Sequence, residues 1–205
     1  MTPLGVVVGK AYPLGLDNVD TDSIIPARWL KTVDREGLAV GAFEALRERP
    51  GNPFDDPDYA GSPILVAGCN YGCGSSREHA AWAVAGMGIR VVIASSFADI
   101  HRANLLKNGI LPVALPGDQV ASLLASARRG EVFTVDLERQ HAQVASGRAF
   151  AFQVDPLARE GLLRGLDEID VTLAFGAAIG EHERDVLARE PWLSDAGRRS
   201  GHAPA

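Results

Sequence analysis

The chain has 205 residues, of which 46% are hydrophobic and 22% are charged, and its formal net charge is −6 at pH 7. No stretch reaches the roughly 20 apolar residues of a membrane-spanning helix, and no signal peptide is evident, so we expect a cytoplasmic protein. The negative charge disfavours nucleic acid and anionic membranes as partners.

Apolar runs and helical patterns alternate along the chain. Residues 4–8, 64–67, 90–94 and 110–114 predict strands, whereas residues 37–48, 75–86, 98–108 and 119–129 predict helices. Residues 50–63 predict a surface loop, residues 131–154 short strands with a turn near Gly147, and residues 178–189 a late helix before Pro191. The alternation favours a mixed α/β core with right-handed crossovers. We expect one domain over residues 1–192 and a disordered tail over residues 193–205.

Residues 68–80 read Gly-Cys-Asn-Tyr-Gly-Cys-Gly-Ser-Ser-Arg-Glu-His-Ala and join a predicted strand to a predicted helix. Backbone N–H groups at a helix start have no intrahelical acceptor and carry the positive end of the helix dipole, so they attract anions. Arg77 adds a positive charge and a planar fork that suits a carboxylate. The segment therefore predicts an anion-binding loop.

Ordinary structural roles could account for parts of this segment. Ser75 and Glu78 have the spacing of a capping box, in which both side chains satisfy backbone N–H groups. The glycines could serve only to permit positive φ in a tight turn. A cap, however, requires neither the second serine, Ser76, nor Arg77. The density of small, hydroxyl and charged residues therefore favours a functional site.

Other kinds of site do not fit the spacing. A Walker-type phosphate loop requires a lysine before the serine, and a nucleophile elbow requires a glycine two residues after it, where Arg77 stands. Cys69 and Cys73 are the only cysteines, whereas an iron–sulfur cluster normally takes four thiolates. A zinc site would need two further ligands, and His79 is the only imidazole nearby. We therefore expect this chain to bind no metal by itself.

A second polar segment, Asn-Val-Asp-Thr-Asp-Ser-Ile-Ile-Pro, occupies residues 18–26. It also has an ordinary explanation, because Asp22 or Ser23 could cap a short helix near Pro26. Just beyond it, Trp29 and Leu30 would suit an apolar group of a substrate, although such residues on a short helix are more often part of the core.

Together with Ser-Phe-Ala-Asp-Ile at residues 96–100 and Asn-Gly-Ile-Leu-Pro at residues 108–112, these segments resemble the small subunit of 3-isopropylmalate dehydratase. That family is similar to the swivelling final domain of aconitase. The resemblance extends over about residues 1–192. It implies an α/β fold of the swivelling β/β/α type, with a mixed sheet and flanking helices.

The resemblance also implies an activity, in which 2-isopropylmalate and 3-isopropylmalate interconvert by dehydration and rehydration in leucine biosynthesis. The large subunit of the family holds a [4Fe–4S] cluster, a Lewis acid for the departing hydroxyl, and the small subunit is inactive without it. We expect a heterodimer or a heterotetramer. In this sequence, the resemblance assigns catalysis to Ser75, as the base, and to Asp22, and substrate binding to Ser76, Arg77, Thr21, Gly74, Trp29 and Leu30.

Two alternatives remain open. A related dehydratase could act on citramalate or homoaconitate, with a different pocket around Trp29 and Leu30. A non-catalytic anion-binding module would keep the loop of residues 68–80 but would not need Ser75 for turnover.

Overall fold

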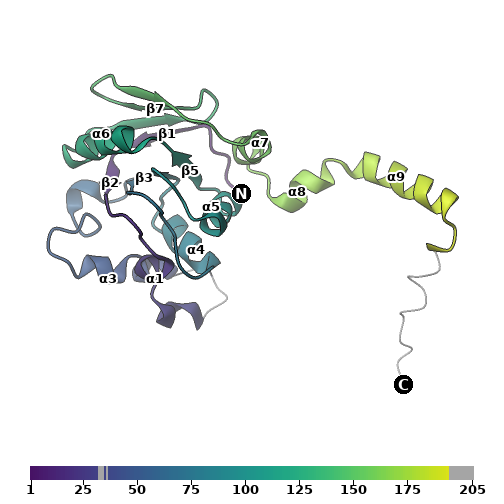
Figure 1. The fold of residues 1–205 in the computed structure, drawn as a ribbon, viewed down its shortest axis with the longest axis horizontal. Helices are drawn as coiled ribbons and strands as arrows, with labels where there is room; N and C mark the ends of the chain where they lie inside the picture. Colours follow the sequence, from purple (N-terminus) through teal and green to yellow (C-terminus); the bar gives the residue numbers. More distant parts are fainter. Residues whose placement is uncertain (32–34, 36, 194–205) are drawn as a thin grey trace. The chain divides into compact units, whose positions relative to one another are not determined.

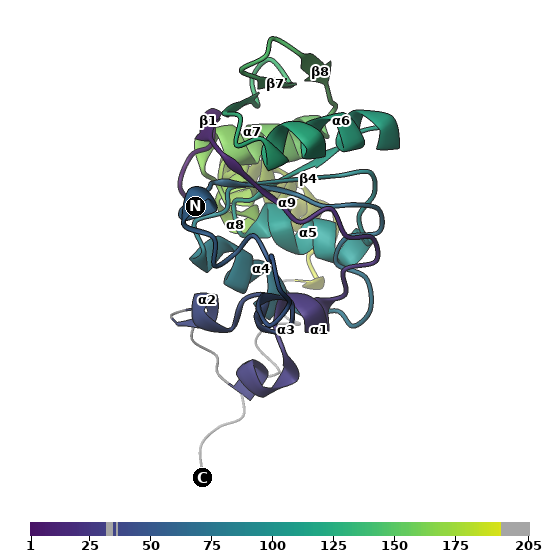
Figure 2. The ribbon, with the colours of Figure 1, turned by 90° about the vertical axis from the view of Figure 1, so that its left-hand side faces the viewer.

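The computed structural model describes residues 1–31, 35 and 37–193, and the chain divides into two compact units, Met1–Leu166 and Asp167–Ala205. In the first unit an antiparallel sheet, a parallel sheet and a group of helices follow one another (Figures 1 and 2). Of the predicted tail, residues 194–205 lie outside the described residues. No helix in the described part of the chain is long and apolar enough to cross a membrane.

The parallel sheet has the strand order β2 (Ala11–Pro13), β3 (Ile64–Val66), β4 (Val91–Ala94) and β5 (Leu111–Ala114). Apart from Pro13 and Ala114 at their ends, the residues of these strands are buried on both faces, as is usual for parallel sheets with covered faces. Because successive side chains of a strand point to opposite faces, Leu65 joins one hydrophobic cluster while Ile64 and Val66 join another. The sheet therefore separates two cores.

Helices cover the first face of the parallel sheet. α4 (Glu78–Gly86) and α5 (Asp99–Lys107) are the crossovers that follow β3 and β4, and the short helices α1 (Thr21–Ile24), α2 (Leu38–Gly41) and α3 (Glu44–Arg47) complete this layer (Figure 2). Two 3₁₀ turns, Ala27–Lys31 and Pro57–Tyr59, belong to the connection between β2 and β3.

The antiparallel sheet has the order β1 (Val6–Gly9), β6 (Phe133–Asp136), β7 (His141–Val144) and β8 (Ala149–Ala151). Its buried side chains alternate along the strands and share the second cluster with the parallel sheet. Helix α6 (Gly117–Arg128) contributes Val120, Leu123 and Ala127 to this cluster, and α7 (Pro156–Arg164) contributes Leu162.

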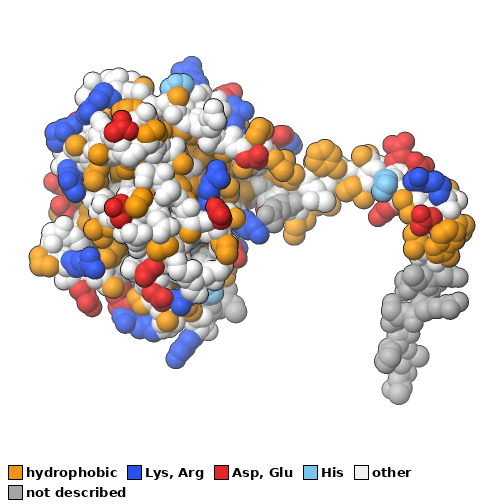
Figure 3. Space-filling view, viewed as in Figure 1, with side chains coloured by type: hydrophobic (Ala, Val, Ile, Leu, Met, Phe, Trp, Pro, Cys, Tyr) orange, Lys and Arg blue, Asp and Glu red, His pale blue; other side chains and the backbone are white. Residues whose placement is uncertain are grey.

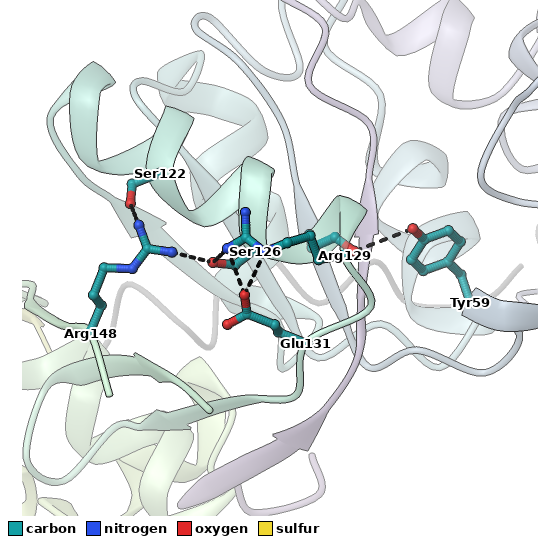
Figure 4. A network of polar contacts seen from close by, with 7 residues as sticks. Tyr59, Ser122, Ser126, Arg129, Glu131 and Arg148 are labelled. Atoms are coloured by element: carbon teal, nitrogen blue, oxygen red, sulfur yellow. Dashed lines mark hydrogen bonds and ion pairs between the residues drawn. The ribbon is translucent and has the colours of Figure 1, made fainter. Parts of the chain in front are cut away.

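A polar network joins α6 to the turn between β7 and β8 (Figure 4). The fully buried hydroxyl of Ser126 accepts hydrogen bonds from Arg129 Nη2 at 3.0 Å and from Arg148 Nη2 at 2.9 Å. Arg148 Nη1 also donates to Ser122 Oγ at 2.6 Å, and Arg129 forms an ion pair with Glu131 at 2.6 Å. Two guanidinium groups therefore share one buried oxygen as a hydrogen-bond acceptor.

The second unit contains α8 (Glu168–Leu173) and α9 (Gly176–Arg189). None of its described side chains is buried, and large apolar side chains lie at its surface (Figure 3). The exposed ones are Ile169, Leu173, Phe175, Ile179, Leu187, Trp192 and Leu193.

The α/β prediction is confirmed, and the parallel and antiparallel pairings occur in separate sheets. Strands β3, β4 and β5, helices α5, α6 and α9, and the hairpin with Gly147 in its turn lie where the sequence predicted them, within a few residues. The predicted helix over residues 37–48 is wrong, because it is divided into α2 and α3. The predictions omitted β2, α7 and α8.

Candidate functional site

The site lies at one edge of the parallel sheet, where the loops that follow β2, β3 and β4 meet. These strands are neighbours, so their carboxyl ends open onto the same edge, where ligands of α/β proteins usually bind. The loops are joined by backbone hydrogen bonds, including Gly68 N to Leu16 O at 2.9 Å and Tyr71 N to Ser96 O at 3.0 Å. Parallel bridges pair Asp20 with Cys73 and Tyr71 with Phe97, which continues the sheet into the loops.

A cavity of about 250 Å³ opens between these loops. It combines hydroxyl, cationic and acidic side chains with two glycines and the start of α5. Its lining residues are Thr21, Gly72, Gly74, Ser75, Ser76, Arg77, Ala98, Asp99, Ile100 and His101. Five residues of the predicted site, Thr21, Gly74, Ser75, Ser76 and Arg77, therefore share one cavity.

Ser75 and Ser76 precede helix α4 and do not cap it. The helix begins at Glu78, and its N-cap residue is Arg77, which makes no side-chain cap hydrogen bond. Glu78 Oε1 accepts hydrogen bonds from Trp82 Nε1 at 3.2 Å and from Asn108 Nδ2 at 3.1 Å. The predicted helix start at residue 75 and the capping-box alternative are therefore wrong. Both serines lie exposed in the loop.

Two glycines give this loop its path. Gly72 has φ +77° and Gly74 has φ +85°, in the left-handed region that favours glycine. A Cβ atom at Gly72 would also clash with the ring of His101. The backbone at Gly72 can therefore lie directly against α5, and the following residues turn toward the cavity.

Thr21 and Asp22 reach the same site from the loop after β2. Thr21 is 1% exposed, its backbone N–H donates to Cys73 O at 3.0 Å, and its hydroxyl donates to Ser75 O at 2.8 Å. The cap of α1 is Asp20, which accepts from Ser23 N at 2.7 Å, so the expectation that Asp22 or Ser23 caps a helix is wrong.

Because Asp20 caps the helix, the side chain of Asp22 points elsewhere and forms an ion pair with Arg77 Nη1. The Arg77 side chain is 21% exposed and that of Asp22 is 54% exposed. A guanidinium carries five N–H donors, so this pair orients Arg77 while using only part of its capacity. An anion in the cavity can use the remainder.

Trp29 and Leu30 do not line the cavity. Both pack against the first hydrophobic cluster, and Trp29 Nε1 donates to Glu44 Oε2 at 2.9 Å. This hydrogen bond is the main cause that lowers the pKa of Glu44. Their contact with a substrate stays a prediction.

Within the described part of the chain, the cysteines of the loop have no neighbouring side chains that would complete a metal centre. Cys69 N donates to Asp17 Oδ1 at 2.6 Å, and a hydrogen bond with Asp17 also raises the pKa of the Cys69 thiol, which disfavours the thiolate that a metal requires. Among the residues that the structure describes, no three His, Cys, Asp or Glu side chains gather as ligands. The described residues do not fit an iron–sulfur cluster.

His101 lines the cavity, although no sequence motif assigned it a role. It lies in the first turn of α5, which starts at Asp99 directly after the loop that follows β4. The motif at residues 96–100 marked this loop, but only the fold brings the residue that follows the motif against Gly72. The cavity is therefore lined by a cation, hydroxyl groups and a buried imidazole. This arrangement is suited to binding a small carboxylate.

Comparison with known proteins identifies relatives of this chain. Residues 1–118 match the Aconitase C-terminal domain family. The chain is 50% identical over 194 residues to the 3-isopropylmalate dehydratase small subunit of Novosphingobium aromaticivorans. This match covers 95% of this chain and 96% of the relative. It is 52% identical to that of Zymomonas mobilis, over 94% of this chain and the whole of the relative.

The chain belongs to the 3-isopropylmalate dehydratase small-subunit family.

A solved structure agrees with this membership. The 3-isopropylmalate dehydratase of Methanocaldococcus jannaschii matches the chain with a TM-score of 0.67 at 26% identity, over 86% of this chain and 99% of the other. The expected aconitase-type α/β fold is therefore confirmed. Membership in a small-subunit family also implies a large subunit as partner.

Proposed function

We propose that this chain is the small subunit of a hydro-lyase that interconverts 2-isopropylmalate and 3-isopropylmalate in leucine biosynthesis. The observation that carries the proposal is the cavity lined by Ser75, Ser76 and Arg77, whose guanidinium forms an ion pair with Asp22. The chain is also about 50% identical to 3-isopropylmalate dehydratase small subunits. The exposed serines and the anion-binding character of Arg77 suit a substrate with carboxylates.

Ser75 is the proposed base. Its alkoxide oxygen takes the proton from the substrate carbon, and the electron pair of the broken C–H bond forms the double bond. The hydroxyl leaves the adjacent carbon with its bonding electrons and takes up a proton to become water. Rehydration adds a hydroxyl to the carbon that lost the proton and a proton to the carbon that lost the hydroxyl. A serine is a poor base near neutral pH, so its alkoxide needs nearby positive charge and aligned N–H dipoles. Arg77 and the start of α4 lie in the same loop and can supply both.

Arg77 and Ser76 are the proposed carboxylate ligands. The Asp22 ion pair holds the guanidinium from the opposite loop, and Thr21 fixes the backbone of Ser75 through its hydroxyl. Gly74 allows the turn that presents both serines. Trp29 and Leu30 are proposed to contact the apolar group of the substrate, outside the part of the site that this cavity forms.

The proposed partner is a large subunit that carries a [4Fe–4S] cluster, in a cytoplasmic heterodimer or heterotetramer. The two cysteines of this chain and the raised pKa of the Cys69 thiol support assignment of the cluster to the partner. The cavity of this chain then provides one side of the active site, so the chain alone should have no activity.

The test is anaerobic turnover of 2-isopropylmalate by this chain mixed with its cognate cluster-loaded large subunit, with citramalate as the competing substrate. We expect a preference for isopropylmalate that Ser75→Ala abolishes while the subunits still assemble. Ser146→Ala, in the exposed turn between β7 and β8, is the matched control and should leave turnover unchanged.

Other outcomes change specific parts of the proposal. A preference for citramalate would keep the mechanism and change the pathway. Full turnover by Ser75→Ala would remove the serine as base, and no turnover by an assembled, cluster-loaded wild-type complex would favour an anion-binding module.

A further inference from the structure

His101 has an environment that packing alone does not explain. Its side chain is 2% exposed, and neither Nδ1 nor Nε2 has a hydrogen-bond partner in the described part of the chain. The ring lies against Gly72 on one side and meets Tyr71 edge-on, with centroids 5.4 Å apart. The hydroxyl of Tyr71 is also buried without a partner there.

Leaving buried polar atoms unpaired is unfavourable, because they lose their hydrogen bonds to water and gain none in return. A phenylalanine at position 101 would fill a similar volume without that cost. The imidazole therefore indicates a partner that arrives from outside the chain, and the cavity that His101 lines is the route by which it can arrive.

The protonation state of His101 limits what that partner can be. Burial lowers the pKa of the imidazole to about 4, so the ring is neutral near pH 7, with one nitrogen as donor and the other as acceptor. The charged side chains that line the same cavity are Arg77 and Asp99. Arg77 suits one carboxylate of a diacid, and a neutral imidazole N–H at the wall of the same cavity suits a further oxygen of the same ligand.

We propose that His101 is a substrate-binding residue, whose ring N–H donates a hydrogen bond to a carboxylate oxygen of the substrate held by Arg77. This inference rests on the proposed function and deepens it. The hydrogen bond would satisfy a donor that is buried and unpaired in the free chain. A ligand without this oxygen would leave the donor unpaired and would therefore bind less tightly. His101 thereby selects for a diacid.

The sharpest test is the pair His101→Gln and His101→Met in the complex with the large subunit. Glutamine and methionine have similar lengths and volumes, but only glutamine has an N–H donor. We expect kcat/KM for 2-isopropylmalate to fall roughly 10- to 100-fold in His101→Met, mainly through KM, and only a few-fold in His101→Gln. The melting temperature of His101→Met should be equal to or above that of His101→Gln.

Equal kinetics for the two variants, with wild-type turnover intact, would overturn this role of His101 and leave the proposed function standing. No turnover by the assembled wild-type complex would instead overturn the proposed function. Should both variants fail to fold, the wild-type complex with ¹⁵N-labelled histidine decides the question. A new slowly exchanging imidazole N–H signal on addition of 2-isopropylmalate supports the inference, and an unchanged spectrum overturns it.

Discussion

At the scale of single residues, His101 makes the stability of the chain depend on pH. Burial lowers its pKa from 6.5 to about 4, so between these pH values the unfolded chain binds a proton that the folded chain does not. The free energy of unfolding should therefore fall as the pH falls from 6.5 to 4, by on the order of 3 kcal/mol from this group. Urea unfolding of wild type and His101→Met at several pH values measures the difference. Equal slopes for both proteins would show that the folded chain binds this proton as readily as the unfolded chain.

The residues of the loops were predictable because their chemistry is concentrated in short segments. Thr21 and the run from Gly74 to Arg77 meet in one cavity, as the motifs indicated. The ion pair of Asp22 with Arg77 was less accessible from sequence, because it requires that Asp20 take the capping role. His101 could not be found from spacing, since only the crossover after β4 brings it to Gly72.

At the scale of elements, Ser126 should contribute more to stability than its neighbour Ser122. Ser126 is fully buried and accepts hydrogen bonds from two guanidinium groups, whereas Ser122 is half-buried and accepts one (Figure 4). Ser126→Ala should therefore lower the free energy of unfolding by about 2 kcal/mol, and Ser122→Ala by less than half of this. Denaturant unfolding compares the two variants. The opposite order would mean that Arg148 is held mainly by Ser122.

The elements that the sequence misplaced were decided by long-range packing. In the predicted helix over residues 37–48, Phe43 has φ +55°, its N–H donates to Ile24 O at 2.7 Å, and its buried ring stacks on Phe54 at 4.2 Å. These contacts are made with residues of other segments of the chain, which the local sequence pattern of residues 37–48 does not indicate. Helix α7 is a different case, because its Asp155 cap, Pro156 and terminal Gly165 are ordinary helix signals that were overlooked.

At the scale of the whole molecule, the two units differ in what holds them together. Both hydrophobic clusters consist of residues from the first unit, from Leu4 to Leu162, whereas the described side chains after Asp167 contribute no buried residue. A chain that ends at Leu166 should therefore fold with a melting temperature within a few degrees of the full chain. Thermal unfolding followed by circular dichroism tests this. A large loss of stability would instead support the predicted single domain over residues 1–192.

The strand order has a consequence for how the site forms during folding. β3, β4 and β5 are joined by α4 and α5, so they can pair from segments that are near in sequence. β2 must instead meet β3 across the whole connection from Pro13 to Ile64, and closing such a loop costs entropy before any contact compensates for it. The loop of residues 68–77 can therefore take shape early, whereas Thr21 and Asp22 join it only when β2 pairs with β3. The chain then becomes able to bind substrate in the folding step in which β2 completes the parallel sheet.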